Sequence, residues 1–136
     1  MAIDKNVYLN KKEIFLTAYA SLDEAVKINY SEIVRDAVIQ RFEYTFELFW
    51  KLLKYYLKEY EGIEANSPKS VIREIFSNKL INEKESVILF EFVETRNLTV
   101  HTYNQNKAKE AYKIISKNYT QMLRITQNLF NNIESK

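Results

Sequence analysis

Hydrophobic residues recur every three or four positions through most of the chain, and this spacing is typical of amphipathic α-helices. The first such stretch covers about residues 4–27, and the second covers about residues 31–60. Ser31 and Glu32 fit the N-cap and the first turn of the second helix, because a serine oxygen accepts from free backbone N–H groups and a carboxylate favours the helix N-terminus. Gly62 stands where the C-cap of this helix would fall.

Three more helices are predicted beyond Gly62. Ser67 and Pro68 fit the N-cap and first position of a short helix, since proline is tolerated where no N–H is needed. Asn82 and Glu85 form the pattern of a capping box for a fourth helix. The fourth helix reaches at least Arg96, and the last helix runs from Asn104 or Asn106 to about residue 131.

The second helix has apolar residues on nearly two faces, which predicts burial on more than one side. One face carries Phe42, Phe46, Phe49, Leu53 and Leu57, and its neighbour carries Thr45, Leu48, Leu52, Tyr55 and Tyr56. In so small a protein this width suggests an oligomer interface in addition to the core. The alternative is a wide stripe that is buried inside a single bundle.

We therefore expect one all-α domain over residues 1–136, folded as an antiparallel up-and-down four-helix bundle with an additional short helix. A length of 136 residues suits a single domain, and 46% hydrophobic residues suffice for a packed core. One glycine and one proline leave too little turn chemistry for a β-sandwich, a β-barrel or a glycine-rich phosphate loop.

The composition also limits the chemistry. The absence of cysteine excludes disulfides, thiol nucleophiles and thiolate zinc sites, and a single histidine excludes any site that needs two imidazoles from one chain. A net charge of +2 is too small to indicate nucleic-acid binding by itself. We expect no metal or cofactor. With no signal peptide and no uncharged stretch of membrane-spanning length, we expect a cytoplasmic protein without a membrane partner.

One segment of the fourth helix is unusual. Leu89, Val93, Arg96, Val100 and Tyr103 are spaced as a core-facing stripe that contains an arginine. A buried guanidinium needs a carboxylate, a backbone cluster or an anionic ligand, because leaving it unpaired is too costly. Asn97 and His101 are four residues apart and share the neighbouring face of a helix.

This set of side chains could cleave a phosphodiester without metal. A neutral His101 could take the proton of a ribose 2′-hydroxyl, and Arg96 could hold the negative charge that develops on phosphorus. A second proton-transfer group would come from a dimer mate or from water. The alternative is that Arg96 and His101 form a structural pair, with their hydrogen-bonding groups satisfied inside the fold and no catalytic role.

The second helix carries a ladder of charges and a tyrosine-rich end. Arg41, Glu43, Glu47 and Lys51 form either a solvated or dimer-rim ladder, or a network in which Glu43 or Glu47 pairs with Arg96. The tyrosines could stack nucleobases or pack beneath a loop. They are Tyr55, Tyr56 and Tyr60.

The segment Arg96-Asn97-x3-His101-x-Tyr103 resembles the signature of the HEPN superfamily in the form found in HepT-like toxins. Residues 35–54, 67–74 and 96–104 also resemble blocks of the nucleotidyltransferase substrate-binding proteins, so the likeness spans about residues 30–120. The resemblance implies a helical bundle similar to the C-terminal domain of kanamycin nucleotidyltransferase. It also implies a homodimer and a separate minimal nucleotidyltransferase as partner.

The resemblance further implies roles for individual residues. Arg96 would stabilise the phosphate or the transition state, His101 would act as base, and Asn97 would orient the substrate or the imidazole. Tyr103 would accept AMP from the partner enzyme, which would silence the protein.

Three hypotheses follow. The chain is a metal-independent endoribonuclease of a toxin–antitoxin module, acting on tRNA or mRNA, or a non-catalytic subunit that presents a substrate to the nucleotidyltransferase. In the third, purely structural hypothesis, Arg96 and His101 belong to a buried network that holds the dimer together.

Overall fold

The computed structural model describes residues 5–136, which form five α-helices and no strand. The helices are α1 (Lys5–Val26), α2 (Glu32–Glu61), α3 (Pro68–Ser77), α4 (Glu83–Thr99) and α5 (Gln105–Glu134). The prediction of an all-α fold with four long helices and one short helix is confirmed. The predicted start of the first helix at residue 4 lies outside the described residues.

The helix boundaries follow from the capping residues. Ser31 accepts a hydrogen bond from the Val34 N–H, and Asn82 forms a capping box with Glu85. Gly62 adopts φ +67°, the left-handed conformation that favours glycine at the end of a helix. At the start of α3, Ser67 and Ser70 form the capping box that a serine–glutamate pair usually makes.

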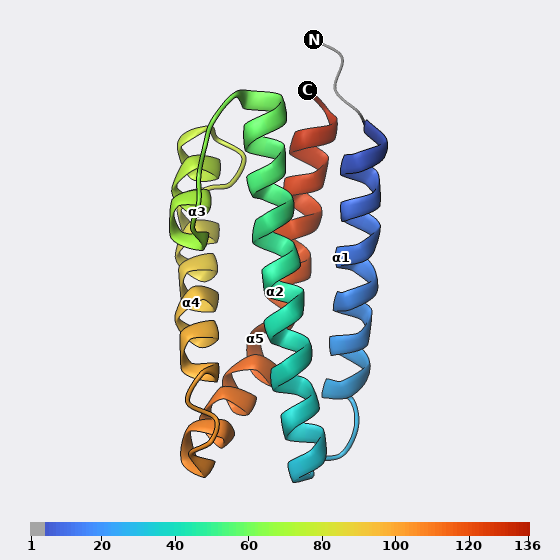
Figure 1. The fold of residues 1–136 in the computed structure, drawn as a ribbon, viewed down its shortest axis with the longest axis vertical. Helices are drawn as coiled ribbons and strands as arrows, with labels where there is room; N and C mark the ends of the chain where they lie inside the picture. Colours follow the sequence, from blue (N-terminus) through green and yellow to red (C-terminus); the bar gives the residue numbers. More distant parts are fainter. Residues whose placement is uncertain (1–4) are drawn as a thin grey trace.

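The four long helices alternate in direction and form an up-and-down bundle (Figure 1). The N-terminal part of α1, the C-terminal part of α5 and the end of α2 lie at one end of the bundle (Figure 1). The α1–α2 link and the turn between α4 and α5 lie at the other end. The segment 62–67 runs back along the bundle, so that Lys69 at the start of α3 pairs with Glu94 of α4 at 3.4 Å.

Helix α2 is the central element, because it contacts each of the other four helices. Its apolar residues are buried within this one chain on both faces, including Phe46, Thr45 and Leu52. The wide apolar arc of α2 therefore fits the alternative of a stripe that is buried inside a single bundle, and the expected homodimer stays a prediction. The packing of α1, α3, α4 and α5 around α2 accounts for the arc without a second subunit.

The tyrosines at the end of α2 pack within the protein. Tyr56 is buried and stacks on Tyr60 with ring centroids 5.1 Å apart, and Tyr55 lies under the ammonium of Lys11. The packing alternative is the one that the structure supports. None of the helices within residues 5–136 has the length and apolar character that crossing a bilayer requires.

Candidate functional site

Two residues of the motif line a cleft between α2, α3 and α4. This motif cleft has a volume of about 320 Å³. Its lining residues are Phe46, Glu47, Trp50, Ser67, Pro68, Lys69, Val93, Arg96 and Asn97. It therefore combines two cations, an amide, a carboxylate and an indole over an apolar floor of Phe46 and Val93.

Glu47 connects the groups of the motif cleft. Its Oε2 accepts a hydrogen bond from Trp50 Nε1 at 3.0 Å and lies 3.8 Å from Arg96 Nη2, while its Oε1 lies 3.2 Å from Lys51 Nζ. Burial by itself would raise the pKa of the Glu47 carboxyl, but the hydrogen bonds from Trp50 and Lys51, together with the positive charges of Lys51 and Arg96, lower that pKa below its usual value. The carboxylate is thus ionised at neutral pH and faces the arginine.

Arg96 is less buried than its place in the apolar stripe predicted. Its side chain is 38% exposed, and among residues 5–136 its guanidinium contacts Glu47 as an ion pair but donates no hydrogen bond. The buried face of α4 continues from Val93 through Thr95 and Thr99, so Arg96 lies at the edge of that face and not in its middle. Because the ion pair between Arg96 and Glu47 is long and half-exposed, the N–H donors of the Arg96 guanidinium remain available to a ligand in the cleft.

His101 and Tyr103 lie in the turn between α4 and α5 and not on a helix. The His101 N–H donates to the Leu98 carbonyl, and the Asn104 N–H donates to the His101 carbonyl, which closes the turn. The prediction that Asn97 and His101 share one helix face was wrong, because the helix ends between them. The predicted burial of Val100 and Tyr103 was also wrong, since they are 56% and 82% exposed.

The rings of His101 and Tyr103 lie together at the surface, with centroids 6.1 Å apart and planes inclined by 71°. Neither residue lines the motif cleft. The structure therefore divides the motif into two groups, with Arg96 and Asn97 in the cleft and the imidazole and phenol in the turn that follows.

The predicted charge network of α2 is present only in part. Arg41 donates to the Ser21 carbonyl of α1 at 2.7 Å, so it points away from Arg96. Glu43 is half-buried and forms no ion pair with any residue of the described chain, whereas Glu47 and Lys51 form the expected i,i+4 pair. Of the two proposed carboxylates, Glu47 is the one near Arg96.

The buried arginine of this protein is Arg35, which sequence reasoning did not single out. Its side chain is 3% exposed, donates to Asp36 Oδ1 at 3.0 Å and donates to Gln105 Oε1 at 2.8 Å. Its pKa is raised chiefly by the Asp36 hydrogen bond, against the effect of burial, with a further contribution from Tyr30. Arg35 thus ties the start of α2 to the first turn of α5, directly after the His101 turn.

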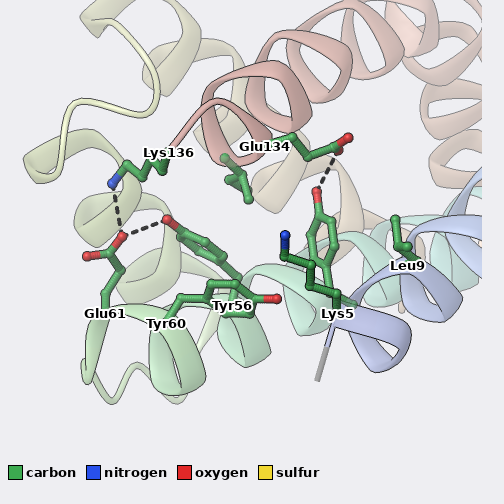
Figure 2. A pocket seen from close by; sticks show the side chains of 9 residues that line it. Lys5, Leu9, Tyr56, Tyr60, Glu61, Glu134 and Lys136 are labelled. Carbon is green, nitrogen blue, oxygen red and sulfur yellow. Dashed lines mark hydrogen bonds and ion pairs between the residues drawn. The ribbon is translucent and has the colours of Figure 1, made fainter. Parts of the chain in front are cut away.

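A second pocket of about 380 Å³ lies at the end of the bundle where α1 begins and α2 and α5 end (Figure 2). This terminus pocket is lined by Lys5, Tyr8, Leu9, Tyr56, Tyr60, Glu61, Ile133, Glu134 and Lys136. Tyr8 donates to Glu134 at 3.0 Å, and Tyr56 donates to Glu61 at 2.6 Å (Figure 2). Tyr56 and Tyr60 were noted in the sequence, but nothing in their spacing indicated that α1 and α5 would enclose them.

The described residues contain no group of three or more histidine, cysteine or carboxylate side chains placed to hold a metal ion. The motif cleft and the adjacent turn contribute an arginine, an imidazole, an amide and a phenol. These are groups that bind anions, transfer protons or accept a transferred group.

Comparison with known proteins places the chain among its relatives. It is 33% identical over 88 residues to the probable ribonuclease HepT of Haemophilus influenzae, a match that covers 59% of this chain and 59% of that protein. The chain thus spans less than two thirds of the curated relative that it matches.

Solved structures extend the likeness over nearly the whole chain. A protein from Thermus thermophilus is 39% identical, with a TM-score of 0.74 over 88% of this chain and 98% of that one. The cytosolic protein YutE of Bacillus subtilis has a TM-score of 0.78 at 17% identity, covering 98% of this chain and 92% of its own. A mutant of the toxin–antitoxin MntA-HepT has a TM-score of 0.75 at 16% identity, covering 96% and 99%.

The two distant structures share the fold, and the family is decided by the sequence. The model of the family described as nucleotidyltransferase substrate binding protein like matches residues 11–131. This range contains the motif, the cleft and all but the outer turns of α1 and α5. The resemblance drawn from residues 30–120 is thereby confirmed, and the chain belongs to the nucleotidyltransferase substrate-binding protein-like family.

Proposed function

We propose that this protein is the bundle subunit of a two-component nucleotidyltransferase module of the toxin–antitoxin type, and that it cleaves RNA without a metal ion. The proposal rests on two features that are close in sequence. Arg96 keeps guanidinium donors free in the motif cleft, and His101, the only histidine of the sequence, is exposed in the turn that follows α4. The 33% identity to a probable ribonuclease HepT supports the same reaction.

In the proposed reaction, His101 removes the proton of a ribose 2′-hydroxyl, and that oxygen attacks the adjacent phosphorus. Arg96 binds the phosphoryl oxygens through its donor fork and stabilises the added negative charge, while Asn97 orients the substrate. The 5′-oxygen leaves with a proton from water or from the histidine of a second copy. The products are a 2′,3′-cyclic phosphate and a 5′-hydroxyl end.

In this scheme, Arg96 is paired with Glu47 before the substrate binds and exchanges this ion pair for a contact with the substrate phosphate. The Glu47 carboxylate is held by Trp50 and Lys51 and lies 3.8 Å from the guanidinium, so it orients Arg96 without saturating the donors. A phosphate is the stronger bidentate partner and would replace this long contact.

The proposed control point is Tyr103. Its phenol is 82% exposed, so the active site of a separate nucleotidyltransferase can reach it. Attack of the phenol oxygen on the α-phosphorus of ATP would form the AMP ester and release pyrophosphate. An AMP group on Tyr103 would stand beside His101, whose ring centroid is 6.1 Å away, and would block access to the imidazole.

The test compares purified wild type with His101→Ala in EDTA, using total RNA and defined tRNA, with both folds checked by circular dichroism. We expect wild type to produce 2′,3′-cyclic phosphate ends and the variant to lose roughly 100-fold or more in rate. Tyr103→Phe is the matched control, which should cleave RNA and fail to accept AMP from the partner enzyme. Equal cleavage by wild type and His101→Ala would refute the assignment of the base.

A second function is favoured by one observation: His101 does not line the cleft that contains Arg96. In this alternative the protein is a non-catalytic subunit that binds a phosphate- or carboxylate-bearing substrate in the motif cleft and docks a minimal nucleotidyltransferase. It predicts a stable hetero-complex and no RNA cleavage at micromolar protein. In that case Arg96→Ala would weaken substrate binding while His101→Ala would not.

A further inference from the structure

A third hollow, of about 360 Å³, lies against the start of α5 at the same end of the bundle as His101 and Tyr103. It is lined by Tyr30 of the α1–α2 link and by Lys109, Tyr112 and Lys113 of α5. Lys109 is five residues beyond the Asn104 N-cap, a distance of about 7.5 Å along the helix axis. The hollow is therefore the next surface that a ligand extending from the His101 turn along α5 would meet.

The two tyrosines form an ordered aromatic surface. Their ring centroids lie 5.0 Å apart, with the planes inclined by 73° in an edge-to-face arrangement. Tyr30 remains 49% exposed, although it packs on Tyr112 and interacts with the buried Arg35. A ring that is held from one side and open on the other can stack a planar ligand at little cost in conformational entropy.

The ammonium groups of the two lysines that line the hollow are unpaired. Lys109 and Lys113 are exposed, lie one helical turn apart, and form no ion pair with any described residue. Lys51 and Lys69 near the motif cleft are paired with Glu47 and Glu94 in contrast. Two free ammonium groups spaced along one helix suit successive phosphates of a chain more than a single small anion.

We propose that Tyr30, Tyr112, Lys109 and Lys113 form a docking platform for single-stranded RNA, which leads the strand to the His101 turn. The inference rests on the proposed ribonuclease function and names the form of RNA that the site takes. Stacked bases would lie on the tyrosines and the backbone would lie along the lysines, a combination that binds single strands with little sequence preference. A rigid duplex hides its bases and cannot use the aromatic surface.

The experiment measures binding of a fluorescein-labelled 2′-O-methyl RNA 12-mer, which has no 2′-hydroxyl to react, by anisotropy at several salt concentrations. We expect Lys109→Gln/Lys113→Gln to bind roughly 25-fold more weakly at 0.1 M salt, and its log Kd against log salt to be about 1.4 less steep, for two lost single-strand phosphate contacts. The matched control is Lys58→Gln/Lys84→Gln, which removes two exposed, unpaired lysines elsewhere in the described chain and should bind like wild type.

A second pair of variants tests stacking separately from charge. Tyr30→Phe keeps the ring and should bind the 12-mer as tightly as wild type, whereas Tyr30→Leu should lose roughly five-fold or more. Equal binding by Phe and Leu variants that melt like wild type would overturn the stacking role. Equal binding by the two lysine double variants, or no affinity of wild type for the 12-mer, would overturn the platform.

Cleavage of the unmodified 12-mer separates this inference from the proposed function. If wild type cleaves it and the double variant Lys109→Gln/Lys113→Gln cleaves and binds equally well, the platform is wrong and the ribonuclease assignment stands. If the double variant loses binding but wild type cleaves nothing, the platform stands and the ribonuclease assignment is wrong.

Discussion

The motif cleft and the terminus pocket are alike in size and in kind of residue, yet they differ in how their charges are satisfied. Their volumes are about 320 and 380 Å³, and each is lined by at least one carboxylate, at least one lysine and aromatic rings. In the terminus pocket, Glu61 accepts from Tyr56 and pairs with Lys136 at 2.9 Å, while Glu134 accepts from Tyr8 and pairs with Lys12 at 2.7 Å.

The motif cleft is the opposite case. Its arginine is held by one carboxylate contact at 3.8 Å, and the imidazole and phenol that follow it in the chain are exposed. Short hydrogen bonds between partners close the terminus pocket and join α1, α2 and α5, so its polar groups contribute to stability. Donors that the fold leaves open at the motif cleft contribute little to stability and are available to a ligand. The two pockets therefore cannot be distinguished by their volumes. They differ in whether the polar side chains that line them already have hydrogen-bond partners within the protein.

The largest effect that this comparison predicts is on cleavage by Arg96→Lys. Lysine keeps the charge but loses the bidentate fork, so RNA cleavage should fall roughly 100-fold while the melting temperature stays within about 2 °C. Arg124→Lys, at an exposed position of α5, is the matched control and should leave the rate unchanged. A much lower melting temperature with an unchanged cleavage rate would show that Arg96 stabilises the fold, as the polar groups of the terminus pocket do, and does not act on the substrate.

The sequence was sufficient for the fold because the signals were local. The capping pattern of Asn82 and Glu85 and the glycine at position 62 define helix ends through bonds within four or five residues, and apolar periodicity defines the buried faces. The sequence left two explanations of the wide apolar arc of α2 open, because periodicity shows how much of a helix is buried and not which element buries it. Four neighbours from one chain and a second subunit produce the same pattern.

The candidate site could be predicted less well because it depends on where a helix stops and on contacts between distant residues. The stripe from Leu89 to Tyr103 assumed a continuous helix, but the Val100 N–H bonds to Leu98 and the chain enters a turn. That turn exposes Tyr103. The pairing of Arg35 with Gln105, 70 residues away, has no local signal, so the buried arginine was assigned to the wrong position.

Arg35 provides the next test, because it supports the His101 turn from inside the protein. Arg35→Met keeps the buried apolar stem but loses the hydrogen bonds to Asp36 and Gln105, and we expect a loss of about 2 kcal/mol in the free energy of unfolding. Urea denaturation followed by Trp50 fluorescence measures it. Arg124→Met, which removes an exposed charge, should change the free energy by less than about 0.5 kcal/mol. Equal values for the two variants would contradict the anchoring role.

Tyr56→Phe tests the terminus pocket as a structural device. The hydroxyl donates to Glu61 at 2.6 Å from an almost fully buried ring, so its removal should cost about 1.5 kcal/mol of unfolding free energy. RNA cleavage per folded molecule should not change, because the pocket lies at the opposite end from the His101 turn. A loss of cleavage at unchanged stability would assign this pocket, and not the motif cleft, to function.

The smallest effect concerns the pH dependence of Glu61→Gln. Hydrogen bonds from Tyr56, and next from Lys136, hold the pKa of the Glu61 carboxyl below its usual value, against the effect of burial. A carboxyl with a depressed pKa in the folded state stabilises the fold above its unfolded pKa, and this contribution is lost as the pH falls through the folded pKa. Glu61→Gln should therefore be less stable than wild type by under about 1 kcal/mol at pH 7, and the difference should close as the pH falls below about 4. Urea unfolding at pH 7, 5, 4 and 3 measures it, with Glu64→Gln as the exposed control that follows wild type throughout. A difference that persisted to pH 3 would mean that Glu61 acts by packing and not as an ionised partner of Tyr56 and Lys136.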